Sequence, residues 1–339
     1  MALLKSGIIA PLGIGTVLSF AIHPLVSGSI SAFFTFCPSE IQQPVLNVVN
    51  SFVSTSILNT LVRPITVAFW LGLLSRLNSY LSRRSANNWA DDTYNWEEEI
   101  VLITGASSGY GERMTELLAQ RGIKVITISR GPLKPRIASY KSVYWYKCDV
   151  TNFERVSQIA AQIRREHGDP TILVNNAGVL SKVLLLEQHV EDVKKMFDVN
   201  LISHWKLLQE FLPAMIRKNH GHVISIASLA SFISTPGMGE YAATKHGLLA
   251  LHDTLRQELK YVYKAERVRT SIINPGWTDT PMVQNTWEAA LKKKGTAIMK
   301  TDEVVARIVN VILSGESCGP LPIPSYSTLA IGARMLVFP

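Results

Sequence analysis

Cysteine is scarce in this sequence, where Cys37, Cys148 and Cys318 are the only three among 339 residues. Their spacing matches neither a disulfide framework nor a zinc site, so we expect a reducing compartment. His220 and His222 lie close together, but no cysteine or third histidine completes a metal-binding pattern around them. The sequence therefore predicts no bound metal.

Charge is scarce at the front of the chain, where Lys5, Glu40 and Arg63 are the only charged residues before position 76. About 20 apolar residues span a bilayer, and prolines inside such a segment indicate kinks or re-entrant turns. A cleaved signal peptide fits poorly, because more apolar sequence follows the first uncharged stretch. We expect residues 1–84 to anchor the protein in a membrane, and the alternative is a soluble extension packed on the next domain. The uncharged stretches are 6–39, 41–62 and 64–75.

A basic cluster of Arg76, Arg83 and Arg84 follows, and then a polar and acidic linker at 85–99. Lysine and arginine beside a membrane segment mark the cytoplasmic side and favour contact with anionic lipid. We therefore expect the rest of the chain to face the cytosol. The net charge of +8 is better explained by a membrane surface than by nucleic acid, because no basic stripe with interleaved aromatic residues occurs.

In the region from 100 to 325, short continuous apolar runs alternate with stretches in which apolar residues have helical spacing. This alternation predicts an α/β domain with a doubly wound parallel sheet. Residues 277–299 lack a clear period, and 326–339 form an apolar tail. Short apolar runs predict strands at 100–104, 124–129, 143–148, 171–174, 222–227 and 268–273. Helical spacing predicts helices at 111–121, 152–167, 190–218, 240–263 and 301–314.

Three glycines, Gly105, Gly109 and Gly111, follow the first predicted strand. A strand, a glycine turn and a helix form a phosphate cradle, in which backbone N–H groups and the helix N-terminus receive a pyrophosphate. The spacing differs from the usual G-x-G-x-x-G fingerprint. A tight turn without a ligand therefore remains the alternative.

Arg130 stands at the end of the second predicted strand, where the adenosine ribose of a dinucleotide is expected. An acidic residue there binds the 2′-hydroxyl of NAD, whereas the planar charged fork of arginine suits the 2′-phosphate of NADP. No acid stands beside Arg130, so the position favours NADP(H). The alternative is a solvated loop arginine.

Tyr241 and Lys245 are four residues apart, which places them on one face of a helix. A tyrosine ordinarily has a pKa of about 10, and a neighbouring cation lowers it. We expect Lys245 to lower the pKa of Tyr241 and to make the phenol a usable acid or base.

These residues occur in a fixed order with several others, and the order resembles the short-chain dehydrogenase/reductase family over roughly residues 96 to 325. The resemblance implies a Rossmann fold and an oxidoreductase, with 277–299 as the substrate lid. The motifs that carry it are Thr104-Gly-x-x-x-Gly-x-Gly111, Cys148-Asp-Val150, Asn175-Asn-Ala-Gly178, Asn200, Ser228, Tyr241-x-x-x-Lys245 and Asn274-Pro-Gly276.

The resemblance also implies the catalytic roles. Tyr241 would protonate the carbonyl oxygen, Lys245 would hold the nicotinamide ribose, Ser228 would bind the substrate oxygen, and Asn200 would anchor a water. Asp149 would meet the adenine, Asn175 and Asn176 the adenosine side, and Thr278 and Thr280 the carboxamide. The full set implied to contact NADP(H) is Thr104, Gly105, Ser107, Ser108, Gly109, Tyr110, Gly111, Arg130, Asp149, Asn175, Asn176, Tyr241, Lys245, Pro275, Gly276, Thr278 and Thr280.

Within the family, residues 219–228 and the apolar front resemble the membrane-associated retinol and 17β-hydroxysteroid dehydrogenase group. That group implies an oxidoreductase at the endoplasmic reticulum or lipid droplet, and Arg130 makes NADP(H) its expected cofactor. It would interconvert a carbonyl and a primary or secondary alcohol on a retinoid, steroid, lipid or secondary metabolite. Relatives often carry an aspartate near the end of the second strand. Arg130 departs from that pattern and argues against the use of NAD.

Two other functions stay open. One is a lipid-synthesis reductase of the acyl-dihydroxyacetone-phosphate or ketosphinganine type, in which Lys292, Lys293 and Lys294 could meet a phosphate. The other is an inactive membrane scaffold that keeps the nucleotide fold. A homodimer is also an open alternative.

Overall fold

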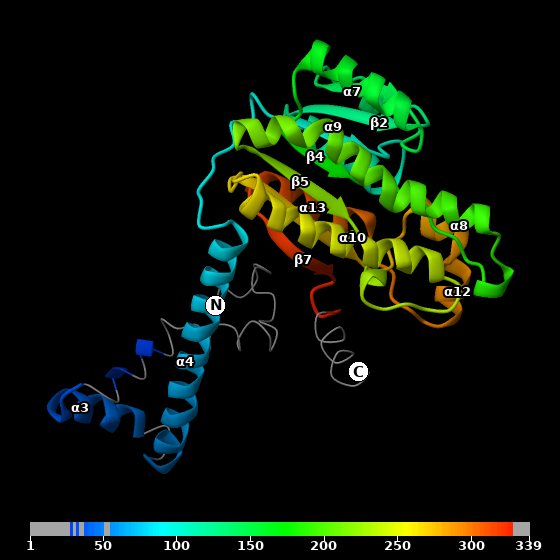
Figure 1. Cartoon of the computed structure of the whole chain (residues 1–339). Coiled ribbons are helices and arrows are strands. Elements are labelled where there is room, and N and C mark those ends of the chain that lie inside the picture. Colours follow the sequence, from blue (N-terminus) through cyan, green and yellow to red (C-terminus); the bar gives the residue numbers. More distant parts are fainter. Residues whose placement is uncertain (1–27, 30–31, 34–36, 51–54, 328–339) are drawn as a thin grey trace, which may run out of the picture. The chain divides into compact units, whose positions relative to one another are not determined.

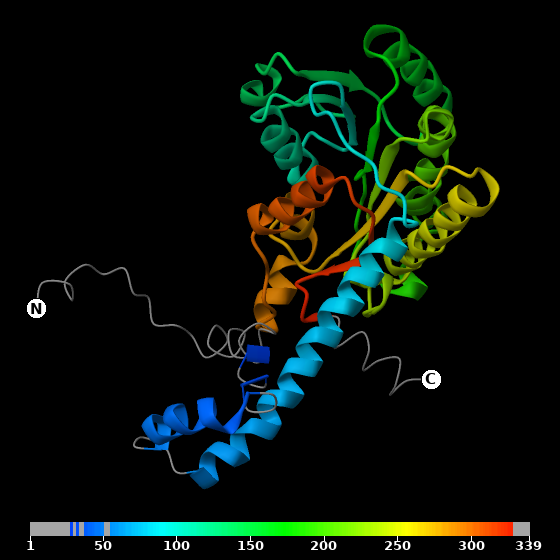
Figure 2. The same cartoon turned by 90° about the vertical axis from the view of Figure 1, so that its left-hand side faces the viewer.

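The protein divides into two compact units, one up to Arg83 and one from Arg84. The first unit holds α3 (Ser39–Asn50) and most of α4 (Thr55–Ala86) (Figure 1, Figure 2). The computed structural model describes residues 28–29, 32–33, 37–50 and 55–327. Within these ranges, no helix has both the length and the apolar content needed to cross a membrane. Most of the predicted apolar stretch 6–39 and of the tail 326–339 lies outside the described residues.

The second unit is built on one sheet of seven parallel strands in the order β3-β2-β1-β4-β5-β6-β7 (Figure 1). Its central strands are buried on both faces, which explains why they appear in the sequence as continuous apolar runs. The predicted doubly wound parallel sheet is confirmed. The strands are β1 (Ile100–Thr104), β2 (Lys124–Ser129), β3 (Val143–Lys147), β4 (Ile172–Asn175), β5 (Gly221–Ile226), β6 (Val268–Pro275) and β7 (Cys318–Ile323).

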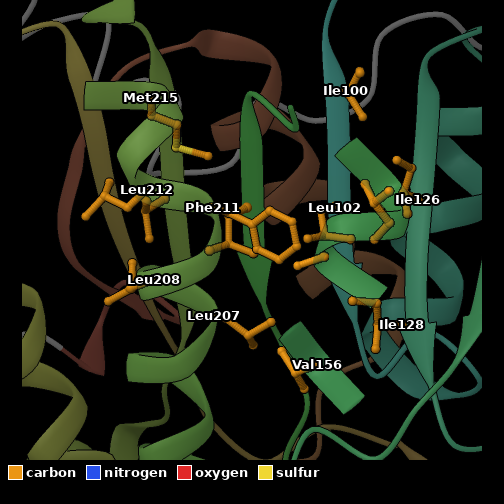
Figure 3. Close-up of a cluster of buried hydrophobic side chains, with 14 of the residues drawn as sticks. Ile100, Leu102, Ile126, Ile128, Val156, Leu207, Leu208, Phe211, Leu212 and Met215 are labelled. Atoms are coloured by element: carbon orange, nitrogen blue, oxygen red, sulfur yellow. The ribbon is translucent and has the colours of Figure 1, made fainter. Parts of the chain in front are cut away.

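Helices cover both faces of this sheet. Successive strand residues point to opposite faces, so Leu102 of β1 packs in one helical layer and its neighbour Ile103 in the other. Figure 3 shows Phe211 of the first layer pointing toward Leu102, with Ile126 of β2 beyond it. The first layer holds α7 (Phe153–His167), α9 (Ser203–Lys218) and α10 (Gly239–Gln257), and the second holds α5 (Gly109–Ala119), the short α6 (Pro135–Ala138) and α13 (Thr301–Ser314).

Three features differ from the predicted elements. The predicted helix 190–218 consists of α8 (Val190–Phe197), a π-helical turn η2 (Asp198–Ile202) and α9, and 240–263 likewise ends in a π turn, η4 (Glu258–Val262). The segment 277–299 contains two short helices, α11 (Pro281–Thr286) and α12 (Glu288–Lys293). The proline-rich stretch after position 317 is the edge strand β7, where prolines are tolerated because one side makes no ladder hydrogen bonds.

The predicted linker 85–99 is packed on the amino-terminal ends of β5 and β6. Arg269 of β6 is 3% exposed, and its guanidinium donates hydrogen bonds to the carbonyls of Asn87 (2.8 Å) and Ala90 (2.7 Å). His220 lies 2.8 Å from a carboxylate oxygen of Asp92 and 3.2 Å from one of Glu99. The hydrogen bond with Glu99, together with Asp92, raises the pKa of His220 above its ordinary value. A buried arginine and a histidine between two carboxylates therefore attach this segment to the domain.

Candidate active site

The glycine turn after β1 brings backbone close to backbone. Gly105 and Gly109 have positive φ angles of 71° and 58°, which other residues rarely adopt. A Cβ on Gly111 would lie 2.4 Å from the carbonyl oxygen of Gly105, so only glycine allows the first turn of α5 to pack there. The turn therefore leaves backbone N–H groups and the start of α5 open to a phosphate group.

Asn176, after β4, holds this turn in place. Its side-chain amide donates to the carbonyls of Thr104 (2.8 Å) and Gly105 (3.3 Å), and its backbone N–H donates to the hydroxyl of Thr104 (3.0 Å). Asn175 lies one residue deeper in β4, and neither polar atom of its buried side chain has a hydrogen-bond partner within the described residues. Of the two predicted adenosine-side residues, Asn176 borders the cleft and Asn175 does not.

A cleft of about 1050 Å³ opens over the carboxyl ends of the strands. The predicted cofactor residues that line it are Gly105, Ser107, Ser108, Gly109, Tyr110, Arg130, Asp149, Asn176, Tyr241, Lys245 and Thr280. Thr104 and Gly111 are buried under the glycine turn and do not line the cleft. Thr278 is also buried, and its hydroxyl donates to the carbonyl of Gly276 (3.1 Å). Pro275 and Gly276 line a neighbouring pocket instead. The glycine cradle and this lining fit a nicotinamide dinucleotide.

The cleft also has lining residues that the motifs did not indicate. They include Ile128, Val179 and Ile226, which lie at or just beyond the ends of β2, β4 and β5. The rule that ligands bind outside the carboxyl ends of parallel strands was the signal that could have found them.

Arg130 lies at the rim of the cleft with 66% of its side chain exposed. A guanidinium nitrogen is 3.8 Å from a carboxylate oxygen of Asp149, which is itself 41% exposed. Exposed ion pairs of this kind contribute little to stability. The guanidinium can therefore leave Asp149 for a stronger anion at small cost.

Of the four predicted catalytic residues, Tyr241 and Lys245 line the cleft, Ser228 lines the neighbouring pocket, and Asn200 is fully buried. Tyr241 and Lys245 lie one turn apart in α10, and Ser228, two residues after β5, forms a hydrogen bond with Tyr241. Asn200 lies in the π turn η2, an irregularity common at functional sites. Its carboxamide pairs with both backbone groups of Val179, accepting from N–H (2.8 Å) and donating to C=O (2.9 Å).

Burial controls the acid–base properties of the pair in α10. Lys245 is 4% exposed, its ammonium donates to the carbonyl of Ile226 (2.9 Å), and burial lowers its pKa to about 8. The prediction that Lys245 lowers the pKa of Tyr241 is wrong for this structure. Burial raises the pKa of Tyr241, and the opposing effect comes from the hydrogen bond with Ser228. The reason is burial, which spacing along a helix does not reveal; the Lys245 nitrogen lies over the ring of Tyr241, 5.6 Å from its centroid.

A second pocket of about 860 Å³ adjoins the cleft, and Tyr241 and Tyr110 line both. The remaining lining is mostly apolar and, among the residues described, carries no charged side chain. It includes Leu180, Leu229, Ile233, Met238, Trp277 and Val283. Met282 and Val283 come from α11, so the predicted lid segment does border this pocket. Lys292 of α12 does not line it and pairs with Glu288 at 2.7 Å.

Comparisons with known proteins show the family to which the catalytic unit is similar. The family model for short chain dehydrogenase matches residues 99–291. Dehydrogenase RED2 of Cochliobolus heterostrophus is 42% identical over 201 residues, which cover 59% of this chain and 76% of that protein. Estradiol 17-beta-dehydrogenase 11 of Macaca fascicularis is 34% identical over 222 residues, covering 64% and 72% of the two chains.

The fold has a solved counterpart in a short-chain dehydrogenase from Streptomyces avermitilis. The TM-score is 0.62 at 23% identity, with 70% of this chain and 92% of the other covered. At that identity the likeness supports the fold alone. On the family match and the sequence relatives, this chain belongs to the short-chain dehydrogenase family, in the group that includes 17β-hydroxysteroid and retinol dehydrogenases.

Proposed function

We propose that this protein is a membrane-associated, NADP(H)-dependent oxidoreductase that interconverts a carbonyl and an alcohol on a lipophilic substrate. The observation that carries the proposal is the position of Tyr241. Its side chain borders both the dinucleotide cleft and the uncharged pocket, so its hydroxyl can reach a substrate oxygen beside the cofactor.

NADP(H), when bound, supplies a hydride to the carbonyl carbon or accepts one from the alcohol carbon. In reduction, the Tyr241 hydroxyl gives its proton to the carbonyl oxygen, and the Ser228 hydroxyl donates a hydrogen bond to the same oxygen. Lys245, whose side chain lines the cleft, would hold the nicotinamide ribose. Asn200 keeps Val179 at the edge of the cleft through its paired hydrogen bonds. In oxidation the same groups act in reverse.

Preference for NADP(H) is supported by Arg130. Its guanidinium is held only by a weak contact with Asp149, at the rim where the adenosine ribose belongs. A 2′-phosphate offers arginine two parallel hydrogen bonds and full opposite charge, which a 2′-hydroxyl does not. The carboxylate that would favour NAD is absent at position 130.

The pocket supports a lipophilic substrate over the alternatives. A phosphorylated substrate such as acyl-dihydroxyacetone phosphate would leave its charge without a cation, and the amine of a ketosphinganine would find no carboxylate. An inactive scaffold would have no need of Asn200, Ser228, Tyr241 and Lys245 in one place.

Membrane association is supported by α4, whose segment 64–81 carries several exposed apolar side chains. Val67, Trp70, Leu71 and Leu74 are each more than half exposed, and Arg83 follows. Exposed apolar patches beside basic residues are typical of membrane contacts. We propose attachment to the endoplasmic reticulum or a lipid droplet, with the catalytic unit in the cytosol. Release of the full chain from membranes by high salt alone would contradict attachment through apolar segments.

The substrate and cofactor are tested together by following cofactor oxidation with the purified full-length protein in detergent. A panel of retinoid, steroid and long-chain carbonyl compounds should include a substrate that is reduced faster with NADPH than with NADH. Tyr241→Phe serves as the inactive control. Turnover of acyl-dihydroxyacetone phosphate alone, or faster turnover with NADH, would contradict the proposal.

A further inference from the structure

Glu240, directly before Tyr241 in α10, is a carboxylate that the mechanism does not use. Its side chain is buried, with 6% exposed. The hydroxyl of Ser181 and the amide of Gln188 donate hydrogen bonds to its two oxygens. Both donors are neutral, and the first turn of α10 adds a helix dipole that favours negative charge. A buried carboxylate is costly unless it is hydrogen-bonded, so this arrangement is a specific one.

Both donors belong to residues 180–188, which are part of the connection between β4 and α8 and are here called the wall segment. Its first residue, Leu180, lines the apolar pocket. The carbonyl of Ser181 accepts a hydrogen bond from the indole of Trp287 (3.1 Å), and the ammonium of Lys182 lies 5.1 Å from the centroid of that ring. Trp287 stands between the lid helices α11 and α12.

A continuous series of contacts therefore joins three elements around the pocket. Glu240 of α10 binds Ser181 of the wall segment, and Ser181 binds Trp287 of the lid. Trp287 also packs with Leu180 and Met238, which both line the pocket. Glu240 itself borders neither the cofactor cleft nor the pocket. An effect on substrate binding can pass through the wall segment and the lid, whereas an effect along α10 to Tyr241 would change the turnover number.

We propose that Glu240 is a positioning residue that holds the wall segment, and through it the lid, against the apolar pocket. Tight binding of a lipophilic substrate then depends on a side chain that never touches it. The inference rests on the proposed function, because it takes the apolar pocket as the substrate site.

Glu240→Ala removes both hydrogen bonds and should raise KM for a lipophilic substrate about 10-fold, as expected for one or two lost charge-assisted bonds. The turnover number and the Kd of NADPH should stay close to those of the unaltered protein. Glu240→Gln should restore KM, because its amide can still bind Gln188 and donate to the Ser181 hydroxyl. Glu187→Ala is the matched control, since Glu187 lies in the same wall segment but is exposed.

Hydrogen exchange tests the same inference without a substrate. In Glu240→Ala, backbone amides of residues 180–188 and 281–293 should exchange faster, whereas those of the glycine turn at 105–111 should not change. Faster exchange throughout the catalytic unit would show that Glu240 stabilises the whole unit and does not specifically hold the wall segment and the lid, and it would overturn the inference. So would KM and exchange equal to those of the unaltered protein. If the unaltered protein turns over no lipophilic carbonyl compound, the proposed function fails, and exchange alone decides whether Glu240 holds the wall segment and lid.

Discussion

Replacing Lys245 by methionine should stabilise the catalytic unit while it abolishes turnover. Burial lowers the pKa of Lys245 from 10.5 to about 8. An unfolded chain therefore binds this proton more tightly, and the charged form destabilises the fold at neutral pH. A shift of roughly 2.5 units corresponds to about 3 kcal/mol, a cost that is relieved as pH rises from about 8 to about 10.5. Methionine has a similar apolar stem and removes the charge.

One interaction opposes this gain. The Lys245 ammonium donates to the carbonyl of Ile226 at 2.9 Å, and losing a buried hydrogen bond costs about 1 kcal/mol. The net stabilisation at neutral pH is then about 2 kcal/mol, or roughly 5 °C in Tm for a domain of this size.

The assay is thermal unfolding of both proteins without cofactor, at neutral pH and again near pH 10. The difference between the two melting temperatures should shrink at the higher pH, because Lys245 of the unaltered protein is then neutral in the folded state. Lys245→Arg is the control, since arginine keeps its charge and should give no stabilisation. The reasoning is refuted if Lys245→Met melts at or below the temperature of the unaltered protein at neutral pH.

Three further changes test other parts of the structure. Tyr241→Phe removes the proton donor and should lower kcat by at least about 100-fold with NADPH binding retained, whereas near-normal turnover would remove Tyr241 from the mechanism. Arg130→Asp should weaken NADPH about 10-fold and NADH little in fluorescence titrations, and equal effects would show that Arg130 does not read the 2′-phosphate. The raised pKa of His220 means that its stabilisation is complete below its ordinary value of about 6.5 and is lost as pH rises through the raised value. The melting temperature of His220→Gln should therefore lie below that of the unaltered protein at pH 6 and approach it in alkali. A difference in melting temperature that grows with pH would contradict this.

Sequence reasoning predicted the fold well where one local pattern determines an element. The strand at 100–104 and the helix at 301–314 match the structure residue for residue, because each combines a clear apolar period with a clear boundary. The strand Cys318–Ile323 was missed, because its prolines argue against a ladder and only its place at the sheet edge removes that objection. The π turn that holds Asn200 has no periodic signature that separates it from an α-helix.

The residues of the site were likewise predicted where a local pattern indicates them. Motif residues such as Gly105 and Tyr241 were predicted from spacing, and the structure brings them into one cleft. A lowered pKa was predicted for Tyr241 but burial raises it, because spacing along a helix does not reveal how deeply a side chain is buried. Glu240 was not singled out, since its partners lie more than fifty residues away and no local pattern joins them.

Deuterium transfer tests the central claim most directly. NADPH carrying deuterium at both C4 positions of the nicotinamide ring would be incubated with the full-length protein and a lipophilic ketone, and the product alcohol analysed by mass spectrometry. The mechanism predicts one deuterium on the carbinol carbon of the product, formed by the unaltered protein and lost with Tyr241→Phe. An alcohol without deuterium, or deuterium transfer that Tyr241→Phe leaves unchanged, would contradict hydride transfer assisted by Tyr241.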